Sequence, residues 1–156
     1  MKIGLYFGSF NPVHNGHLQI AETILAKSDL KKIWFVVSPQ NPLKKKNDLL
    51  NQKDRLQMVK LALKGNKNFS ASDVEFHLPV PSYTIDTLSF LAKKFPQHTF
   101  SVIIGSDNLS KIHLWKNYET LLNDYEIFVY CRGRINKSKW KNYGNIHFPE
   151  VDLLKN

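Results

Sequence analysis

The amino-terminal stretch of the chain predicts a strand, a tight turn and a helix in immediate succession. Residues 2–7 form a short apolar and aromatic run, which is the pattern of a buried strand. Apolar residues from Leu18 to Leu25 then recur at helical spacing, so a helix is expected to open near Gly16. A strand that leads directly into a helix begins a parallel strand–helix–strand unit, and this constrains the fold more than any other feature of the sequence.

Apolar runs and amphipathic segments alternate along the remaining sequence. Further strands are expected at residues 33–37, 69–76, 100–104, 127–130 and 146–148, and helices at 53–64, 85–95 and near 118–122. This alternation predicts an α/β fold, in which helices cover both faces of a parallel sheet and the crossovers are right-handed. The loops that leave the strands are expected to converge on one rim, where such folds bind ligands; they span 8–17, 38–46, 105–115 and 131–134.

The turn between the first strand and the first helix has the composition of a phosphate site. It reads Gly-Ser-Phe-Asn-Pro-Val-His-Asn-Gly-His over residues 8–17, and glycine lets a backbone approach a ligand closely. A helix amino terminus offers unpaired N–H groups and a partial positive charge. His14 and His17 lie three residues apart there, so both rings could face one anion. The alternative is that one histidine caps or packs while the other is solvated.

Three other loops carry residue types that suit an anionic or nucleotide ligand. Lys44 opens a run of lysines, ordinarily a solvated patch, but its place beyond a strand end favours contact with a phosphate. Thr84 is expected to cap the helix that follows Pro81, and the amino terminus of that helix could receive a carboxylate. Asp107 comes just after the strand that ends near Gly105, where it could accept hydrogen bonds from a ribose.

Aromatic and basic residues in the second half of the chain have two interpretations each. Trp115 is either part of the core or a surface on which a heteroaromatic ring stacks. Arg132 lies in a basic loop at a strand end. Arg55 could face a ligand, but a pairing with a surface acid such as Asp54 is favoured, and residues 135–145 are expected at the surface.

Composition narrows the class of protein. The chain has 156 residues, which we expect to form one domain, and a net charge of +9, which favours anionic partners such as nucleotides. Its one cysteine excludes an internal disulfide and fits a reducing compartment. Neither a signal peptide nor a membrane-spanning run is recognisable, so a cytoplasmic protein without a membrane partner is expected. No RNA-binding motif supports a nucleic-acid partner beyond the net charge.

Several motifs together resemble one family of enzymes. The pattern Gly-Ser-Phe-x-Pro-x-His-x-Gly-His at 8–17 resembles the signature of the nucleotidyltransferase superfamily. Pro-Ser-Tyr-Thr-Ile-Asp-Thr at 81–87, Gly-Ser-Asp at 105–107 and Trp115 narrow the resemblance to the bacterial nicotinate-nucleotide adenylyltransferases, over essentially the whole chain. The resemblance implies a Rossmann-like fold of the nucleotidyltransferase type. It also implies transfer of AMP from ATP to nicotinate mononucleotide in NAD biosynthesis, with release of pyrophosphate.

The resemblance also implies roles for individual residues. His14, His17 and Lys44 would be catalytic; Gly8, Ser9, Phe10, His14, His17, Gly105, Asp107 and Arg132 would bind ATP; Lys44, Tyr83, Thr84 and Trp115 would bind nicotinate mononucleotide. The attacking phosphate oxygen is already a nucleophile, so no general base is needed and catalysis reduces to placement and charge neutralisation. Mg²⁺ is expected to arrive bridging the ATP phosphates, and no metal site made by protein side chains is expected.

The sequence departs from the family pattern at three places. Phe7 and Asn11 stand where the family often has Gly and Asp, and Leu43 stands where a histidine often precedes Lys44. The family continues into an Ile-Ser-Ser-Thr-x-Ile-Arg segment that binds the triphosphate, whereas this chain ends at Asn156, so a missing carboxyl-terminal segment is expected. The alternatives are a phosphopantetheine adenylyltransferase, a catalytically impaired nucleotide-binding module and, last, a nucleic-acid binder. The sequence does not indicate an oligomeric state.

Overall fold

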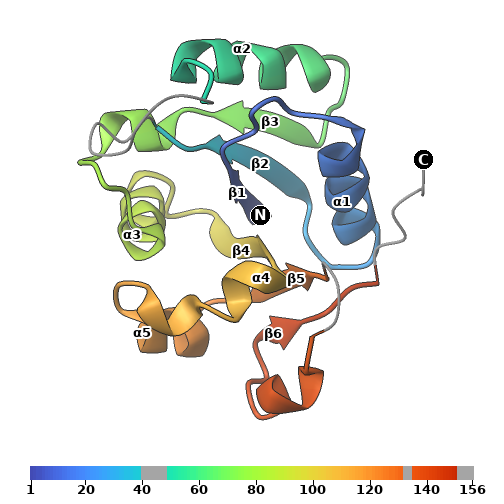
Figure 1. Ribbon diagram of the computed structural model, residues 1–156, viewed down its shortest axis with the longest axis vertical. Coiled ribbons are helices and arrows are strands. Elements are labelled where there is room, and N and C mark those ends of the chain that lie inside the picture. The colour runs from blue at the N-terminus through green and yellow to red at the C-terminus, as the bar shows by residue number, and fades with distance from the viewer. Residues whose placement is uncertain (40–48, 132–134, 151–156) are drawn as a thin grey trace.

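The central element of the structure is the strand β1, Lys2–Gly8, which pairs with a strand on either side. The structure is a computed structural model that describes residues 1–39, 49–131 and 135–150. Within these ranges all strands pair in parallel in one sheet of order β3-β2-β1-β4-β5-β6 (Figure 1). The other strands are β2 Lys32–Val37, β3 Phe69–Ser72, β4 Thr99–Gly105, β5 Ile127–Tyr130 and β6 Ile146–His147. The predicted α/β class is therefore confirmed.

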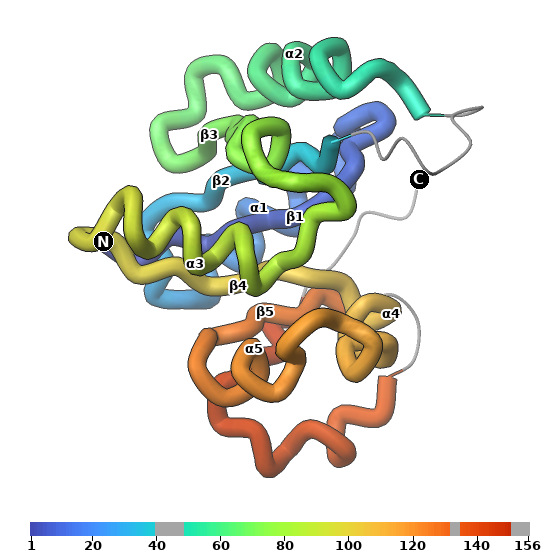
Figure 2. Tube along the Cα trace, turned by 90° about the vertical axis from the view of Figure 1, so that its left-hand side faces the viewer, coloured from blue at the N-terminus to red at the C-terminus, as the bar shows by residue number. Residues whose placement is uncertain are grey.

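Helices cover both faces of this sheet, as the sequence predicts. The α-helices are α1 Asn15–Ala26, α2 Gln52–Ala62, α3 Thr84–Lys94, α4 Ser106–Leu109 and α5 Tyr118–Asp124. Short 3-10 helices are η1 Val74–His77, η2 Ile112–Leu114 and η3 Lys137–Trp140. One core joins α1 and α2 to the sheet, and the other lies beneath α3, α4 and α5. Figure 2 shows α3 and α5 in front of the strands and α1 behind them.

Alternation along the strands explains why both cores form. Successive side chains of a strand point to opposite faces of the sheet. In β1, Leu5 belongs to the core beneath α3 while Tyr6 belongs to the core beneath α1 and α2. Both side chains are almost fully buried, which is why these strands appear in the sequence as continuous apolar runs rather than as alternating patterns.

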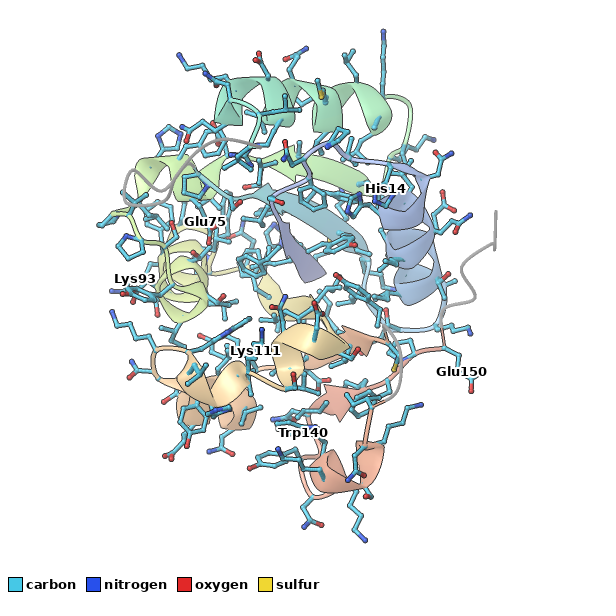
Figure 3. All side chains as sticks on the ribbon, viewed as in Figure 1. His14, Glu75, Lys93, Lys111, Trp140 and Glu150 are labelled. Atoms are coloured by element: carbon cyan, nitrogen blue, oxygen red, sulfur yellow. The ribbon has the colours of Figure 1, made fainter. Side chains whose placement is uncertain are left out.

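Two predictions about local structure were wrong. The expected strand at 69–76 ends at Ser72, and η1 follows it, because the chain turns there and buries Val74 and Glu75 rather than continuing the sheet edge. The segment 135–145 is not all surface, since Trp140 is only 9% exposed and packs into the core beneath α5. Figure 3 shows Trp140 projecting from η3 beside β6.

The topology places a switch point at the ends of β1 and β4. The strand order reverses direction at β1, since β2 and β3 lie on one side of it and β4 to β6 on the other. β1 and β4 are paired as far as Tyr6 and Ile103, and both strands end at a glycine, Gly8 and Gly105. Loops that leave such a switch point diverge and form a crevice beyond the carboxyl ends of the strands.

Candidate active site

The two histidines of the first turn form a reciprocal cap at the start of α1. The Gly16 N–H donates to Nδ1 of His14, and the His14 N–H donates to Nδ1 of His17, both at 3.0 Å. Because each Nδ1 accepts a backbone hydrogen, the neutral form of each ring carries its proton on Nε2. Both histidines therefore cap the helix, whereas the alternative interpretation gave this role to one, and the capping bonds use Nδ1 and not Nε2.

The two imidazole rings lie next to each other at the mouth of the turn. Their centroids are 3.8 Å apart with an angle of 31° between the ring planes. His14 is exposed at the start of α1 (Figure 3). His17 is half-buried, with its ring 5.1 Å from that of Phe10. Glycine at position 16 leaves room for this ring position, since a Cβ there would lie 2.8 Å from Cε1 of His14. The turn thus holds two donors side by side at the positive end of a helix.

Phe10 is an anchor of the turn and not a side-chain contact for a ligand. Its side chain is 2% exposed and packs against the rings of Tyr6 and Phe35, at centroid distances of 5.4 Å for each pair. Its backbone has a positive φ of 48°, an uncommon conformation for a residue with a side chain. Its ring lies directly beneath Gly8, where a Cβ would approach the ring to 3.0 Å. The Phe10 side chain is therefore not available to a nucleotide.

Arg55 was predicted to pair with a surface acid, and this was wrong. Its side chain is completely buried at the start of α2. Nη1 donates to the Ser9 carbonyl at 2.7 Å, and Nε donates to the Leu50 carbonyl at 2.9 Å. Burial lowers the pKa of Arg55 from its ordinary value. The sequence carried one signal of this position, since Arg55 lies one helical turn before the buried Val59 and so shares its inward face.

The end of β4 brings two more predicted residues to the same rim. Gly105 caps the short helix α4, and a Cβ there would lie 2.7 Å from a carboxylate oxygen of Asp107 and 3.1 Å from the ring of Tyr130. Asp107 is exposed, and Ser110 Oγ donates to its main-chain carbonyl at 2.7 Å. The carboxylate of Asp107 therefore folds back over Gly105, at the switch point where a nucleotide ribose is expected.

The start of α3 differs in detail from the prediction. The helix begins at Thr84, its N-cap is Tyr83, and no side-chain hydrogen bond caps it, so Thr84 is the first helical residue and not the cap. The Thr87 hydroxyl instead contacts the Tyr83 carbonyl at 3.3 Å and donates to the Glu75 carboxylate at 2.7 Å. Glu75 is 6% exposed and its burial raises its pKa, while the Thr87 hydrogen bond opposes that rise. Neither Glu75 nor Thr87 was predicted to be part of the site.

A cation links the start of α3 to the segment that carries Trp115. Lys116 Nζ lies 2.9 Å from a carboxylate oxygen of Asp86 and 5.2 Å from the centroid of the Tyr83 ring. Trp115 precedes this lysine and is half-buried against the core beneath α3 to α5. The predicted binding residues Tyr83, Thr84 and Trp115 therefore come from neighbouring segments, as the sequence implied.

Two of the predicted site residues are not among those that the structure describes. Lys44 and Arg132 fall outside the residues that the structure describes. Among residues 1–39, 49–131 and 135–150, no group of three or more His, Cys, Asp or Glu side chains gathers as for a metal ion. Within those same ranges, none of the helices combines the length and the apolar character that a bilayer crossing requires.

Comparison with known proteins identifies the family. The cytidylyltransferase-like family model matches residues 5–148 of the chain. A probable nicotinate-nucleotide adenylyltransferase of Flavobacterium johnsoniae is 54% identical over 157 residues, which cover 99% of this chain and 81% of that protein. A probable nicotinate-nucleotide adenylyltransferase of Cytophaga hutchinsonii is 49% identical over 155 residues, with the same coverage. The chain belongs to the nicotinate-nucleotide adenylyltransferase family.

Solved structures confirm the fold of this adenylyltransferase. The nicotinic acid mononucleotide adenylyltransferase of Plasmodium falciparum complexed with NaAD superposes with a TM-score of 0.83 at 23% identity, covering 99% of this chain and 77% of that one. The same enzyme complexed with APC gives a TM-score of 0.81 at 22% identity. At this level of identity the likeness concerns the nucleotidyltransferase fold.

Proposed function

We propose that this adenylyltransferase joins the AMP unit of ATP to nicotinate mononucleotide, giving nicotinate adenine dinucleotide and pyrophosphate in NAD biosynthesis. The observation that carries the proposal is the reciprocal cap at the start of α1. Nδ1 of His14 and Nδ1 of His17 each accept a backbone N–H, so the neutral form of each ring has its proton on Nε2. Two such donors at a helix amino terminus suit the phosphates of a nucleotide. The identity of the relatives supports the choice of nicotinate mononucleotide.

The reaction is an in-line displacement at the α-phosphorus of ATP. An ionised oxygen of the nicotinate mononucleotide phosphate forms a bond to that phosphorus while the bond to the bridging oxygen of pyrophosphate breaks, and both electrons of the broken bond leave with pyrophosphate. Because the nucleophile is ionised already, the side chains have to align the two phosphates and neutralise the charge on the departing group. His14 and His17 carry out this neutralisation in the proposal, since their Nε2–H groups can donate to the phosphate oxygens.

The acceptor nucleotide is proposed to bind between α3 and the segment around Trp115. The main-chain N–H groups of Tyr83 and Thr84 at the amino terminus of α3 suit the nicotinate carboxylate. The half-buried Trp115 offers an aromatic surface for the pyridine ring. Lys44 and Arg132, outside the described residues, are proposed to contact the mononucleotide phosphate and ATP respectively.

Mg²⁺ is proposed to enter with ATP. The side chains that meet at the first turn are imidazoles, whereas Mg²⁺ prefers oxygen ligands and keeps several water molecules. This donor set fits an ion held by phosphate oxygens and water, with His14 and His17 contacting the phosphates themselves. When bound, the ion would neutralise charge on the β- and γ-phosphates. The single cysteine of the chain suits a reducing compartment, and the cytoplasm is the proposed location.

Pyrophosphate release from ATP and Mg²⁺ tests the proposed reaction. Nicotinate mononucleotide, nicotinamide mononucleotide and phosphopantetheine would be offered separately to the 156-residue chain, and the dinucleotide would be identified by mass spectrometry. We expect release with nicotinate mononucleotide to exceed that with either of the others by at least tenfold. The matched control is Lys93→Met, which removes one exposed positive charge near the end of α3 opposite to the proposed binding site (Figure 3).

Other outcomes would replace the proposal. Release with phosphopantetheine alone would assign the chain to a different reaction of the same fold. ATP binding by calorimetry without turnover on any acceptor would indicate a catalytically impaired nucleotide-binding module. A preference for nicotinamide mononucleotide would contradict the carboxylate role of the α3 amino terminus and leave the adenylyl transfer itself intact.

A further inference from the structure

Arg55 is the one completely buried charged side chain among the described residues, and it lies beneath the turn that the proposed function uses. None of the ion pairs within residues 1–39, 49–131 and 135–150 involves it. Its Nη2 is buried and makes no hydrogen bond to a described residue. A buried cation without a carboxylate is costly to a fold, and its burial already lowers the pKa of this guanidinium. Packing alone gives no reason for a charge at this place.

The guanidinium instead connects two main-chain segments. One donor reaches the Ser9 carbonyl in the turn, and another reaches the Leu50 carbonyl just before α2. The two segments are joined a second time, because the Leu50 N–H donates to Oδ1 of Asn11 at 2.9 Å. Arg55, Leu50 and Asn11 thus tie the turn to the start of α2 on both sides of Phe10.

The bond to Ser9 fixes the orientation of one peptide unit. The cis peptides in the described chain are Asn11–Pro12 and Val80–Pro81, so the Ser9–Phe10 peptide is trans. In a trans peptide the carbonyl and the N–H point in opposite directions. The Ser9 carbonyl points inward to the buried Arg55. The N–H of Phe10 therefore points in the opposite direction, away from the Arg55 guanidinium.

We propose that Arg55 is a positioning residue, which holds the Ser9–Phe10 peptide so that the Phe10 N–H is presented to a phosphate of ATP. The inference rests on the proposed function and adds a residue that the sequence motif does not contain. The positive charge at the carbonyl end also polarises the peptide, which makes its N–H a stronger donor to an anion. The phosphates would in turn supply the negative charge that Arg55 does not find among the described residues.

Lysine cannot take over this role completely. A guanidinium presents several donors in a rigid plane, and here two of them reach two different carbonyls. An ammonium group is a single point on a flexible chain, so it could reach one carbonyl but would not fix the relation between the turn and α2. Arg55→Lys should keep the charge and lose part of the positioning, while Arg55→Met should lose both.

The test compares these two variants with two controls on the same helix. Lys60→Met removes an exposed charge of α2, and Val59→Ala weakens the packing of the buried face without touching the turn. For each protein we would measure thermal unfolding, the KM for ATP and kcat with nicotinate mononucleotide, and the affinity for Mg·ATP by calorimetry without the second substrate. All assays run at least 15 °C below the lowest Tm of the set.

We expect Arg55→Met to lower kcat/KM for ATP about 100-fold and Arg55→Lys about tenfold, since misplacing one oriented donor has effects of this order. The affinity for Mg·ATP should fall in the same order. Lys60→Met should match the wild type, and Val59→Ala should lower the Tm while keeping kcat/KM within threefold. The decisive result is this separation of ATP affinity from stability.

Three outcomes would overturn the inference. The first is a wild-type kcat/KM for ATP in both Arg55 variants, and the second is an equal loss in Val59→Ala. The third is the failure of both Arg55 variants to fold, which would make the residue structural. An inactive wild type that binds Mg·ATP would refute the proposed function alone, because the calorimetric comparison would still decide the role of Arg55. A wild type that neither reacts nor binds would refute both.

Discussion

Replacing Thr87 by valine should destabilise the protein through a buried carboxyl group. The Thr87 hydroxyl donates to Glu75 at 2.7 Å, and the two residues are 0% and 6% exposed. Valine has the shape of threonine without the hydroxyl, so the change deletes the hydrogen bond and leaves the Glu75 carboxyl without this partner. An unsatisfied buried polar group costs about 1–3 kcal/mol. Taking about 2 kcal/mol, the Tm of a protein of this size should fall by about 6 °C.

The same carboxyl group makes stability depend on pH with a defined sign. Burial raises the pKa of Glu75 in the folded protein above its ordinary value of 4.5, so the folded state holds the proton more tightly than the unfolded state. The protonated Glu75 therefore contributes to the free energy of unfolding. This contribution is complete below pH 4.5 and is lost as pH rises through the raised pKa of Glu75 in the folded protein. Thr87→Val removes the hydrogen bond that lowers the pKa of Glu75, so the loss of stability should extend to higher pH and become larger in total.

Glu75→Gln tests the sign independently. A glutamine amide can donate to Oγ1 of Thr87, whose hydroxyl can then donate to the Tyr83 carbonyl 3.3 Å away. The variant therefore mimics the protonated carboxyl group at every pH. It should match the wild type near pH 4.5 and exceed its Tm at pH 8, because no charge is buried there.

Thermal unfolding followed by circular dichroism at pH 4.5, 6 and 8 checks both changes. Thr87→Ser is the control, since it keeps the hydroxyl and removes only a methyl group, and its Tm should stay closer to the wild type than that of Thr87→Val. A Thr87→Val protein within 1 °C of the wild type at pH 8 would refute the hydrogen-bond argument. A Tm difference between Glu75→Gln and the wild type that is the same at pH 4.5 and pH 8 would refute the pKa argument.

Three further predictions concern the active site. His17→Ala should lower turnover roughly 100- to 1000-fold with an unchanged circular dichroism spectrum, because it removes one phosphate donor and one half of the reciprocal cap; turnover within threefold of the wild type would exclude that role. Gly16→Ala places a Cβ 2.8 Å from the His14 ring and should lower turnover about tenfold. Its Tm should stay within a few degrees of the wild type, since alanine favours the helix. Steady-state kinetics measure the effect on turnover, and a melting curve measures the effect on stability. Trp115→Ala should raise the KM for nicotinate mononucleotide about tenfold, the order expected for a lost stacking surface, and leave the KM for ATP within twofold; an effect on ATP alone would contradict the assignment.

Most of the fold could be predicted because the inner strands β1, β2, β4 and β5 are buried on both faces. A strand of this kind is a continuous apolar run, as in Phe100–Ile104, and the helices between the strands show their own period. The failures have a common physical cause, which is burial decided by distant parts of the chain. Trp140 lies in a polar, basic segment, and its burial depends on the core beneath α5. Nothing within residues 135–145 indicates that this core is close.

The positions of the candidate site residues in loops at the rim could be predicted, but the buried side chains beneath those loops could not. Motif residues such as His14 and Trp115 lie in loops at the rim because the parallel topology brings the strand ends together. The positions of Arg55 and Glu75 could not be predicted, because each side chain is buried and its hydrogen-bond partner lies far along the chain. An arginine in an amphipathic helix is ordinarily solvated, and only the inward register with Val59 indicated otherwise.

Arg55 and Thr87 each lie beside a main-chain carbonyl in a segment that the proposed function uses to bind an anion. Arg55 donates to the carbonyl of Ser9, and the hydroxyl of Thr87 lies 3.3 Å from the carbonyl of Tyr83. Each carbonyl belongs to the peptide whose N–H is that of the next residue, Phe10 or Thr84. A trans peptide presents its N–H on the side opposite to its oxygen. Arg55 holds the Ser9 carbonyl, whereas the Tyr83 carbonyl accepts the N–H groups of Asp86 and Thr87 in the first turn of α3. In the proposed function these two backbone amides would donate to anions in addition to His14 and His17. Arg55 and Thr87, which lie beside the two carbonyls, are outside the Gly-Ser-Phe and Tyr-Thr segments that supply the amides.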